Sequence, residues 1–239
     1  MRCGAILTAA GSGTRLGHDL PKALVPLSGT PLVVHAARGL AESGVVDAVV
    51  VTAPAEHLDA FGELFPGGTV PGGSVPVRVV AGGLTRQASV AAGLSALPDD
   101  CTLVLVHDAA RALAGAELTR RVVAALAAGR SAVVPGVPVT DTVKRVAPTD
   151  DGGEVVVETP DRSALRGIQT PQGFRRELLE RAHRAAADRA HDEARAVSDD
   201  AGLVELLGER VHLVPGETRA LKVTTPADLA VAELLLSRP

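Results

Sequence analysis

Aromatic residues are almost absent from this chain of 239 residues, which has no tryptophan, no tyrosine and three phenylalanines. Hydrophobic residues nevertheless make up 46% of it, so the core must be built from Val, Leu, Ile and Ala. That aliphatic composition is typical of a parallel sheet covered by helices. Because a single α/β domain commonly reaches this length, we expect one domain over residues 1–239.

Cysteine, strong net charge and long apolar runs are also lacking. Cys3 and Cys101 lie far apart without metal or redox spacing, which argues against a disulfide scaffold and favours a reducing cytoplasm. The formal net charge of −4 offers no field for nucleic acid or an anionic membrane, so an anionic ligand needs a local basic cluster. The apolar stretch Gly4–Ala10 is too short to cross a membrane and lacks the flanks of a signal peptide. We therefore expect a cytoplasmic protein with neither nucleic-acid nor membrane partners.

Short β-rich runs alternate with helical patterns along most of the chain. Thr30 and Thr85 are placed as N-caps, the first before an apolar helical face that ends at Gly44 and the second before Gln87–Leu97. This alternation predicts a Rossmann-like, doubly wound, mostly parallel sheet whose ligands bind at the carboxyl ends of strands. The predicted strands are Ala5–Thr8, Ala48–Thr52, Val77–Val80, Leu103–Val106 and Ala132–Val134, and the further helices are Ala116–Ala128 and Pro226–Leu236.

The rhythm breaks at about residues 138–160. Two β-rich runs, Val139–Val146 and Glu154–Glu158, flank a turn rich in Asp and Gly, which predicts a hairpin. A two-stranded ribbon is barely stable alone in water, so we expect a protruding dimerisation arm that packs on the main body or on another subunit. The following stretch, Arg175–Arg195, predicts an exposed helix with a charged face.

A glycine-rich loop follows the first strand. It reads Gly11-Ser12-Gly13-Thr14-Arg15-Leu16-Gly17 and is followed by Pro21-Lys22. Glycines let a backbone turn tightly and present amide groups to an anion, and two cations add full charge, so the loop predicts phosphate binding. Leu16 stands where a dinucleotide fingerprint needs glycine, and the Gly-Lys-Ser/Thr of a P-loop is missing.

Two more strand ends carry polar residues. In His107-Asp108-Ala109-Ala110-Arg111, the carboxylate can meet a metal ion or a ribose, and Arg111 can bind an anion or hold the loop through a salt bridge. His107 is expected to pack or hold the loop. Gly82-Gly83 and Ser89 precede or begin a helix, where backbone groups and a hydroxyl can meet a base edge.

Taken in order, these motifs resemble the 2-C-methyl-D-erythritol 4-phosphate cytidylyltransferase family of the non-mevalonate isoprenoid pathway. The resemblance covers nearly the whole chain, and the ordered set is specific where each piece alone is common. The motifs are Ala9–Arg15 with Pro21-Lys22, Gly82-Gly83 with Arg86 and Ser89, Val106–Arg111, Pro138–Lys144, Asp161-Arg162, Thr170–Gln172, Ser198–Ala201 and Leu221–Thr224.

The resemblance implies that the phosphate of methylerythritol phosphate attacks the α-phosphorus of Mg²⁺-bound CTP and displaces pyrophosphate, without a protein nucleophile. It implies a homodimer that exchanges arms, with Arg162 and Thr142 in the neighbouring subunit's site. Mg²⁺ would be bound chiefly through the CTP phosphates, with no protein metal site assigned. The implied catalytic residues are Arg15, Lys22, Arg162 and Lys222; those for CTP are Ala9, Ala10, Gly11, Ser12, Gly13, Gly83, Ser89, Asp108 and Ala109; those for the acceptor are Arg111, Thr142, Arg162, Thr170, Ser198 and Lys222.

Two departures from the family pattern are Ala112, where proline is usual, and Ser198, where threonine is usual. Neither removes a charged group. The alternatives are a ribitol 5-phosphate cytidylyltransferase, which differs mostly in polyol recognition, and a sugar 1-phosphate or molybdenum-cofactor nucleotidyltransferase, which is not expected to share the arm. A dinucleotide-dependent oxidoreductase and a non-catalytic nucleotide-sensing domain are alternatives from other classes.

Overall fold

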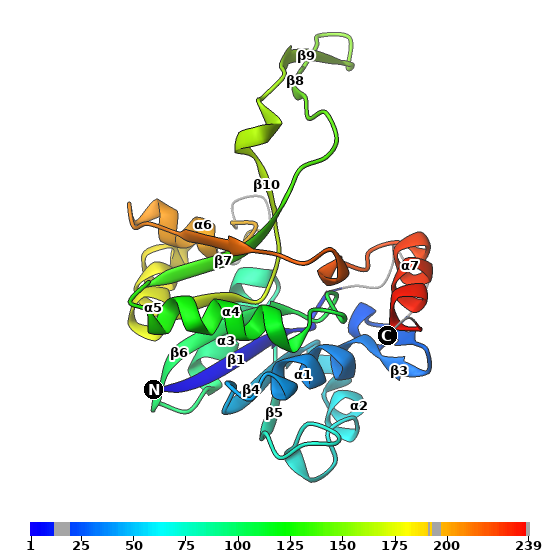
Figure 1. The fold of residues 1–239 in the computed structure, drawn as a ribbon, viewed down its shortest axis with the longest axis vertical. Coiled ribbons are helices and arrows are strands. Elements are labelled where there is room, and N and C mark those ends of the chain that lie inside the picture. Colours follow the sequence, from blue (N-terminus) through cyan, green and yellow to red (C-terminus); the bar gives the residue numbers. More distant parts are fainter. Residues whose placement is uncertain (12–19, 191, 193–196, 238–239) are drawn as a thin grey trace.

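The structure is a computed structural model that describes residues 1–11, 20–190, 192 and 197–237. Its main sheet has the strand order β10-β7-β11-β6-β1-β4-β5, with β12 paired to β7 (Figure 1). The central strands β1, β4, β5 and β6 are parallel to their neighbours in this group. Their bounds are Arg2–Thr8, Ala48–Ala53, Val77–Ala81 and Cys101–Asp108. The predicted doubly wound α/β sheet is therefore confirmed, and each of these strands contains its predicted core.

The other half of the sheet is mixed. Strand β11 (Gln172–Arg175) lies antiparallel between β6 and β7 (Ala132–Pro138), and β10 (Arg166–Ile168) pairs with the far end of β7. Strand β12 (His212–Pro215) pairs with β7 in parallel. Strands β10, β11 and β12 were not predicted from the sequence. They have three or four residues each, which is too short for a periodic pattern to emerge.

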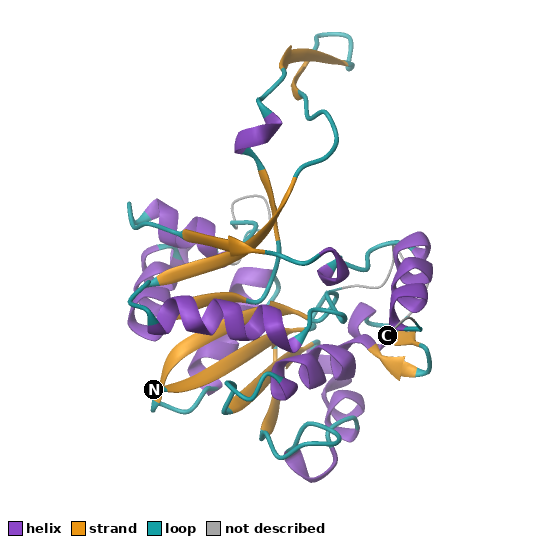
Figure 2. Cartoon of the chain, viewed as in Figure 1, coloured by secondary structure: helices purple, strands orange, loops and turns teal. Residues whose placement is uncertain are grey.

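Helices cover both faces of the sheet (Figure 2). One core cluster contains buried side chains of α1, α2 and α4, and the other contains those of α3, α5 and α6. Neighbouring residues of β1 alternate between them, with Ile6 in one cluster and Leu7 in the other, as the pleat of a doubly covered strand requires. The helices are α1 (Leu32–Glu42), α2 (Leu58–Glu63), α3 (Arg86–Ala96), α4 (Ala116–Ala127), α5 (Arg176–Ala185), α6 (Asp200–Leu206) and α7 (Pro226–Leu236).

Helix capping follows the sequence in two places and departs from it in one. Thr85 caps α3 by accepting from the amide of Ala88 at 3.0 Å, and Thr225 forms a capping box with Asp228 at α7. The predicted cap at Thr30 is wrong, because this residue pairs in the short hairpin of β2 (Pro26–Leu27) and β3 (Thr30–Pro31). The carbonyl of Val25 accepts the first amide of α1 instead.

The segment predicted as one exposed helix over Arg175–Arg195 is shorter and more buried than expected. Helix α5 ends at Ala185 and is followed by a 3₁₀ turn at Ala187–Arg189, while residues 191 and 193–196 lie outside the described ranges. Leu178, Leu179 and Ala182 are buried against the sheet. The opposite face of α5 is charged, as predicted. The helix is more buried than expected because its apolar face covers the mixed half of the sheet.

The predicted hairpin extends away from the sheet at the top of Figure 1. Strands β8 (Arg145–Pro148) and β9 (Glu154–Glu158) pair antiparallel, although β8 begins later than the predicted run Val139–Val146. Every residue of β9 is exposed. We call residues 139–165, between β7 and β10, the arm. None of the helices in the described ranges is long and apolar enough to span a lipid bilayer.

A close approach at Gly93 leads to a stability prediction. A Cβ atom there would lie 2.5 Å from Cγ2 of Ile6 in β1 and 3.1 Å from Cγ2 of Thr52 in β4. We expect Gly93→Ala to lower the free energy of unfolding by about 1–3 kcal/mol, although alanine favours helices. Gly62→Ala in α2 is the control, because a Cβ at Gly62 meets nothing within 4 Å. Urea unfolding measures both, and equal stability of the two variants would contradict close packing at Gly93.

Candidate active site

A pocket of about 620 Å³ opens where the parallel strands end. The backbone keeps these ends together, because the amide of Ala9 donates to the carbonyl of Thr52 at 2.9 Å and that of Ala109 to Thr8 at 3.1 Å. Strand ends of a parallel sheet are the expected place for a ligand. We call this the nucleotide pocket. The residues predicted to contact CTP that line it are Ala9, Ala10, Gly11, Gly83, Ser89, Asp108 and Ala109.

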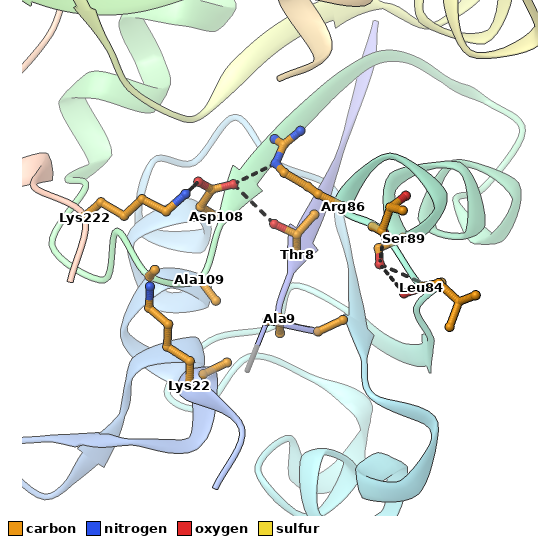
Figure 3. Close-up of a pocket in the computed structure, with 15 residues that line it drawn as sticks. Thr8, Ala9, Lys22, Leu84, Arg86, Ser89, Asp108, Ala109 and Lys222 are labelled. Atoms are coloured by element: carbon orange, nitrogen blue, oxygen red, sulfur yellow. Dashed lines mark hydrogen bonds and ion pairs between the residues drawn. The ribbon is translucent and has the colours of Figure 1, made fainter. Parts of the chain in front are cut away.

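Lys22 also lines the nucleotide pocket. It begins a 3₁₀ turn (Lys22–Leu24), and its amide donates to the carbonyl of Gly11 at 3.2 Å. This bond brings the two ends of the glycine-rich loop together, so the ammonium group enters the pocket beside the end of β1 (Figure 3). Ser12, Gly13 and Arg15, which were predicted to act in this loop, lie outside the described residues.

The opposite wall of the pocket is a tight turn before α3. The hydroxyl of Ser89 lies 3.1 Å from the amide of Gly83, which donates to it, and 2.9 Å from the carbonyl of Thr85, to which it donates (Figure 3). A Cβ at Gly83 would lie 2.4 Å from Cβ of Ala88, so only glycine fits there without movement. Ser89 therefore shapes the turn, and Gly83 and Ser89 both line the pocket.

Asp108, at the end of β6, lies between two cations (Figure 3). Its Oδ1 accepts from Nε of Arg86 at 3.2 Å, and its Oδ2 lies 2.8 Å from Nζ of Lys222. Burial raises the pKa of this carboxyl, but the charges of Arg86 and Lys222 outweigh burial and hold the pKa below its usual range. Asp108 is therefore an anion that orients two positive groups at the pocket.

Lys222 is positioned by backbone contacts around it. The amide of Val223 donates to the carbonyl of Ala110 at 2.8 Å, and Nη1 of Arg111 donates to the carbonyl of Ala220 at 2.8 Å. Nη2 of Arg111 donates to Ile168 at 3.0 Å. Of the two predicted roles of Arg111, anion binding or holding the loop, the structure shows the second. Its contacts are to carbonyl oxygens and not the expected salt bridge.

A second pocket of about 230 Å³ adjoins the first, and Arg86, Asp108 and Lys222 line both. We call it the acceptor pocket. The predicted acceptor residues on its wall are Arg111, Thr170, Ser198 and Lys222.

The hydroxyl of Thr170 already makes hydrogen bonds within the protein. It accepts from the amide of Asp108 at 3.0 Å and lies 2.7 Å from Nδ1 of His107. Burial lowers the pKa of His107 to about 4, so this ring is neutral at physiological pH and its role is to hold the loop. Thr170 therefore has an observed structural contact in addition to its predicted contact with the acceptor.

Thr142 and Arg162 lie on the arm and line neither pocket of this chain. Nη1 of Arg162 donates to the carbonyl of Thr140 at 2.6 Å, which ties the two sides of the arm together. Both residues are exposed. A single chain therefore does not bring these two predicted residues to the others.

Sequence reasoning missed Arg86 and Asp200 as site residues. Arg86 lines both pockets, and its Nη1 donates to Oδ2 of the buried Asp200 at 2.7 Å. Burial lowers the pKa of Arg86, but the two carboxylates raise it more, so it stays above its ordinary value. Both residues belong to motifs named above, but charged residues at the start of a helix are common. No local sequence signal shows that Arg86 and Asp200 form an ion pair.

The chain is similar to known proteins over nearly its whole length. Residues 3–238 match the model of the family described as 2-C-methyl-D-erythritol 4-phosphate cytidylyltransferase. Proteins with that name from Nocardia farcinica and Streptomyces avermitilis are 51% and 47% identical to this chain, covering 98% and 99% of it and 94% and 92% of their own lengths.

Solved structures agree with the sequence comparison. The 4-diphosphocytidyl-2C-methyl-D-erythritol synthase from Anaerococcus prevotii superposes with a TM-score of 0.81 at 29% identity, over 99% of both chains. The cytidylyltransferase from Thermus thermophilus gives a TM-score of 0.74 at 35% identity, over 99% of this chain and 100% of that one. The chain therefore belongs to the 2-C-methyl-D-erythritol 4-phosphate cytidylyltransferase family, as its motifs predicted.

Proposed function

We propose that this chain joins CTP to 2-C-methyl-D-erythritol 4-phosphate, forming 4-diphosphocytidyl-2-C-methyl-D-erythritol and pyrophosphate for non-mevalonate isoprenoid biosynthesis. The observation that carries this proposal is the junction of the two pockets, which share Arg86, Asp108 and Lys222. One pocket has a glycine-lined wall suited to a base, and the other has hydroxyls and cations suited to a polyol phosphate.

The reaction needs no base and no protein nucleophile. An oxygen of the acceptor phosphate, already an anion, forms a bond to the α-phosphorus of CTP, and the bond from that phosphorus to the bridging oxygen of the β-phosphate breaks. The negative charge leaves on pyrophosphate. Lys22, together with Arg15, stabilises charge on the triphosphate, while Lys222 holds the acceptor phosphate in line for attack.

Base recognition uses backbone groups. Cytosine presents an exocyclic amine and ring acceptors at its edge, which pair with main-chain carbonyls and amides. The turn at Gly83 offers such groups without a Cβ in the way, and Ala9 and Ala10 line the same pocket, with Ala10 next to the neighbouring Gly82. Ser89 lines the same pocket and holds the turn through its hydroxyl.

The family implies Mg²⁺, and the donor set fits an ion that is carried mainly by the nucleotide. Asp108 is the acidic residue among the described residues that line the nucleotide pocket, and the described residues contain no cluster of three or more His, Cys, Asp or Glu that could hold a metal. One carboxylate together with substrate phosphates and water suits Mg²⁺. When bound, the ion neutralises phosphate charge, and Asp108 is the residue that would face it.

The arm supports a homodimer in which each subunit completes the other's site. Its exposed apolar side chains are Val143, which precedes β8, and four valines of the hairpin, which is too small to be stable alone: Val146, Val155, Val156 and Val157. As the family resemblance implies, we expect a twofold partner to cover them and to receive Arg162 and Thr142 at its acceptor pocket, and the twofold symmetry would make this exchange reciprocal.

The family model spans residues 3–238, which supports one nucleotidyltransferase domain with an inserted arm at about 138–160. Cys3 and Cys101 are buried free thiols, and burial raises the pKa of Cys3 to about 12. Thiols without a disulfide suit the reducing cytoplasm.

Pyrophosphate release by the purified protein with Mg²⁺ and CTP tests the proposal. We expect turnover with methylerythritol phosphate and none with ribitol 5-phosphate, because the whole chain matches the first family. ATP, GTP and UTP in place of CTP are the controls for the base. Turnover with only ribitol 5-phosphate would preserve the mechanism and overturn the acceptor, and no turnover with either would overturn the function.

A further inference from the structure

A row of charged side chains runs from the protein interior to the junction of the two pockets. Arg86 donates from Nε to Asp108 at 3.2 Å and from Nη1 to Oδ2 of Asp200 at 2.7 Å. Beyond Asp200, Nε2 of His183 lies 2.9 Å from its Oδ1. At the other end, Nζ of Lys222 lies 2.8 Å from Asp108. Negative and positive charges therefore alternate from Asp200 to Lys222.

Asp200 lies at the start of α6 and is 1% exposed. It is not among the residues that line either pocket. A buried carboxylate is costly unless it is paired and hydrogen-bonded. Both of its oxygens have partners, Arg86 from α3 and His183 from α5, so it joins helices that come from separate parts of the chain.

We propose that Asp200 is a positioning residue that holds Arg86, so that Asp108 stays available to orient the ammonium group of Lys222 where the two pockets meet. The inference rests on the proposed function, in which Lys222 binds the acceptor phosphate. Asp200 acts only through Arg86 and contacts no substrate.

The orientation of the Arg86 guanidinium is set by its two acceptors. Its Nη2 is buried and has no hydrogen-bond partner among the described residues, so Asp108 and Asp200 are the two groups that fix the guanidinium. Without the charge of Asp200, the contact to Nη1 is no longer an ion pair and the contact to Asp108 at 3.2 Å becomes the stronger attraction, so the planar group is free to turn one edge toward Asp108 and donate from two nitrogens. Lys222 would then compete with Arg86 for the same carboxylate.

The larger consequence should fall on the acceptor side. Asp108 and Lys222 line both pockets, and the hydroxyl of Thr8 at the end of β1 donates to Asp108 at 3.3 Å, but the turn at Gly83 is held by the hydroxyl of Ser89. Losing the charge of Asp200 should therefore disturb acceptor binding and transfer more than the binding of CTP.

A spectroscopic test observes Lys222 directly and needs no turnover. The lysines of the chain are Lys22, Lys144 and Lys222, so reductive methylation with ¹³C-formaldehyde gives few signals, which keep their positive charge. Lys222→Arg identifies the Lys222 signal. In Asp200→Asn, which keeps the shape and removes the charge, we expect that signal to shift while the signal of Lys144 on the arm stays in place. An unchanged Lys222 signal would overturn the proposal.

Kinetics provide the second readout. We expect Asp200→Asn to raise the KM for methylerythritol phosphate by about tenfold and to change the dissociation constant of CTP less than twofold, since coupling within one network has this size. In an Arg86→Met background the same substitution should have little further effect, because Asp200 acts through Arg86. Additive effects of the two substitutions would overturn that route.

A loss of stability alone must give a different result. Leu126→Ala, in the core cluster on the other face of the sheet, is the control, and it should lower the unfolding midpoint while leaving the Lys222 signal and the acceptor KM unchanged. If Asp200→Asn does not fold, His183→Phe removes the outer hydrogen bond and keeps a ring, with a smaller shift in the same direction expected. Absence of turnover in the unmodified protein would overturn the proposed function, whereas normal turnover with an unaffected Asp200→Asn would overturn only the positioning role.

Discussion

Lys22→Ala is expected to lower kcat by a factor on the order of 10²–10³ while the dissociation constant of CTP changes less than tenfold. Lys22 lines the nucleotide pocket, and the hydrogen bond from its amide to the carbonyl of Gly11 fixes its backbone there. Charge on the phosphates is redistributed as pyrophosphate leaves, so a fixed cation stabilises the transition state more than bound CTP. Single-turnover rates and calorimetric titration with CTP measure the two quantities separately.

Two further variants make that result specific. Lys22→Met keeps most of the side-chain volume and removes the charge, so it should behave as Lys22→Ala does. Arg130→Ala removes one exposed positive charge between the end of α4 and the start of β7, away from the carboxyl ends of the strands, and should leave kcat unchanged. If Lys22→Ala lowered CTP binding and kcat by equal factors, Lys22 would serve binding and not the chemical step.

Mixing inactive Arg162→Ala protein with inactive Lys22→Ala protein is expected to restore activity through hybrid dimers. In a hybrid, one site combines the intact pocket of one subunit with the intact arm of the other. With free exchange at equal amounts, about half of the dimers are hybrids and about a quarter of all sites are complete, which sets the largest recovery. Pyrophosphate release from the mixture, compared with each protein alone, measures it.

The controls for this experiment follow from the same geometry. Native mass spectrometry of subunits with tags of different size shows whether exchange has occurred. A mixture of Lys22→Ala with Lys222→Ala, both in the pockets of one chain, should not regain activity, since neither subunit then offers an intact pocket. Exchange without recovery in the Arg162→Ala mixture would mean that the arm does not complete a partner's site.

Much of the fold and part of the site follow from local sequence. Hydrophobic periodicity, helix caps and turn residues act over a few neighbouring positions, so they can be recognised in the sequence. They predicted strands β1, β4, β5 and β6, the cap at Thr85 and the hairpin near residues 139–158. The phosphate-binding character of the loop before Lys22 and the polar end of β6 at Asp108 are also local, since parallel strands place their carboxyl ends at one edge.

Other features became visible only in the folded chain. Asp200 meets Arg86 across 114 positions of sequence, Thr170 gives its hydroxyl to His107 and to the backbone of Asp108, and Arg111 binds carbonyls where an ion pair was expected. Each of these depends on how distant segments pack, and several partners of the right charge or polarity were available to each residue.

What the sequence by itself determined is thus the family, the order of the central strands and helices along the chain, and the residues that carry positive charge to a phosphate site. What only the tertiary structure decided is which of those residues share a pocket, which are used up in holding loops, and that Arg162 and Thr142 stand apart from the pockets of their own chain. The physical reason is range: periodicity, caps and turns act between near neighbours, whereas ion pairs, buried hydrogen bonds and short antiparallel strands such as β11 form between segments that meet only when the chain has folded.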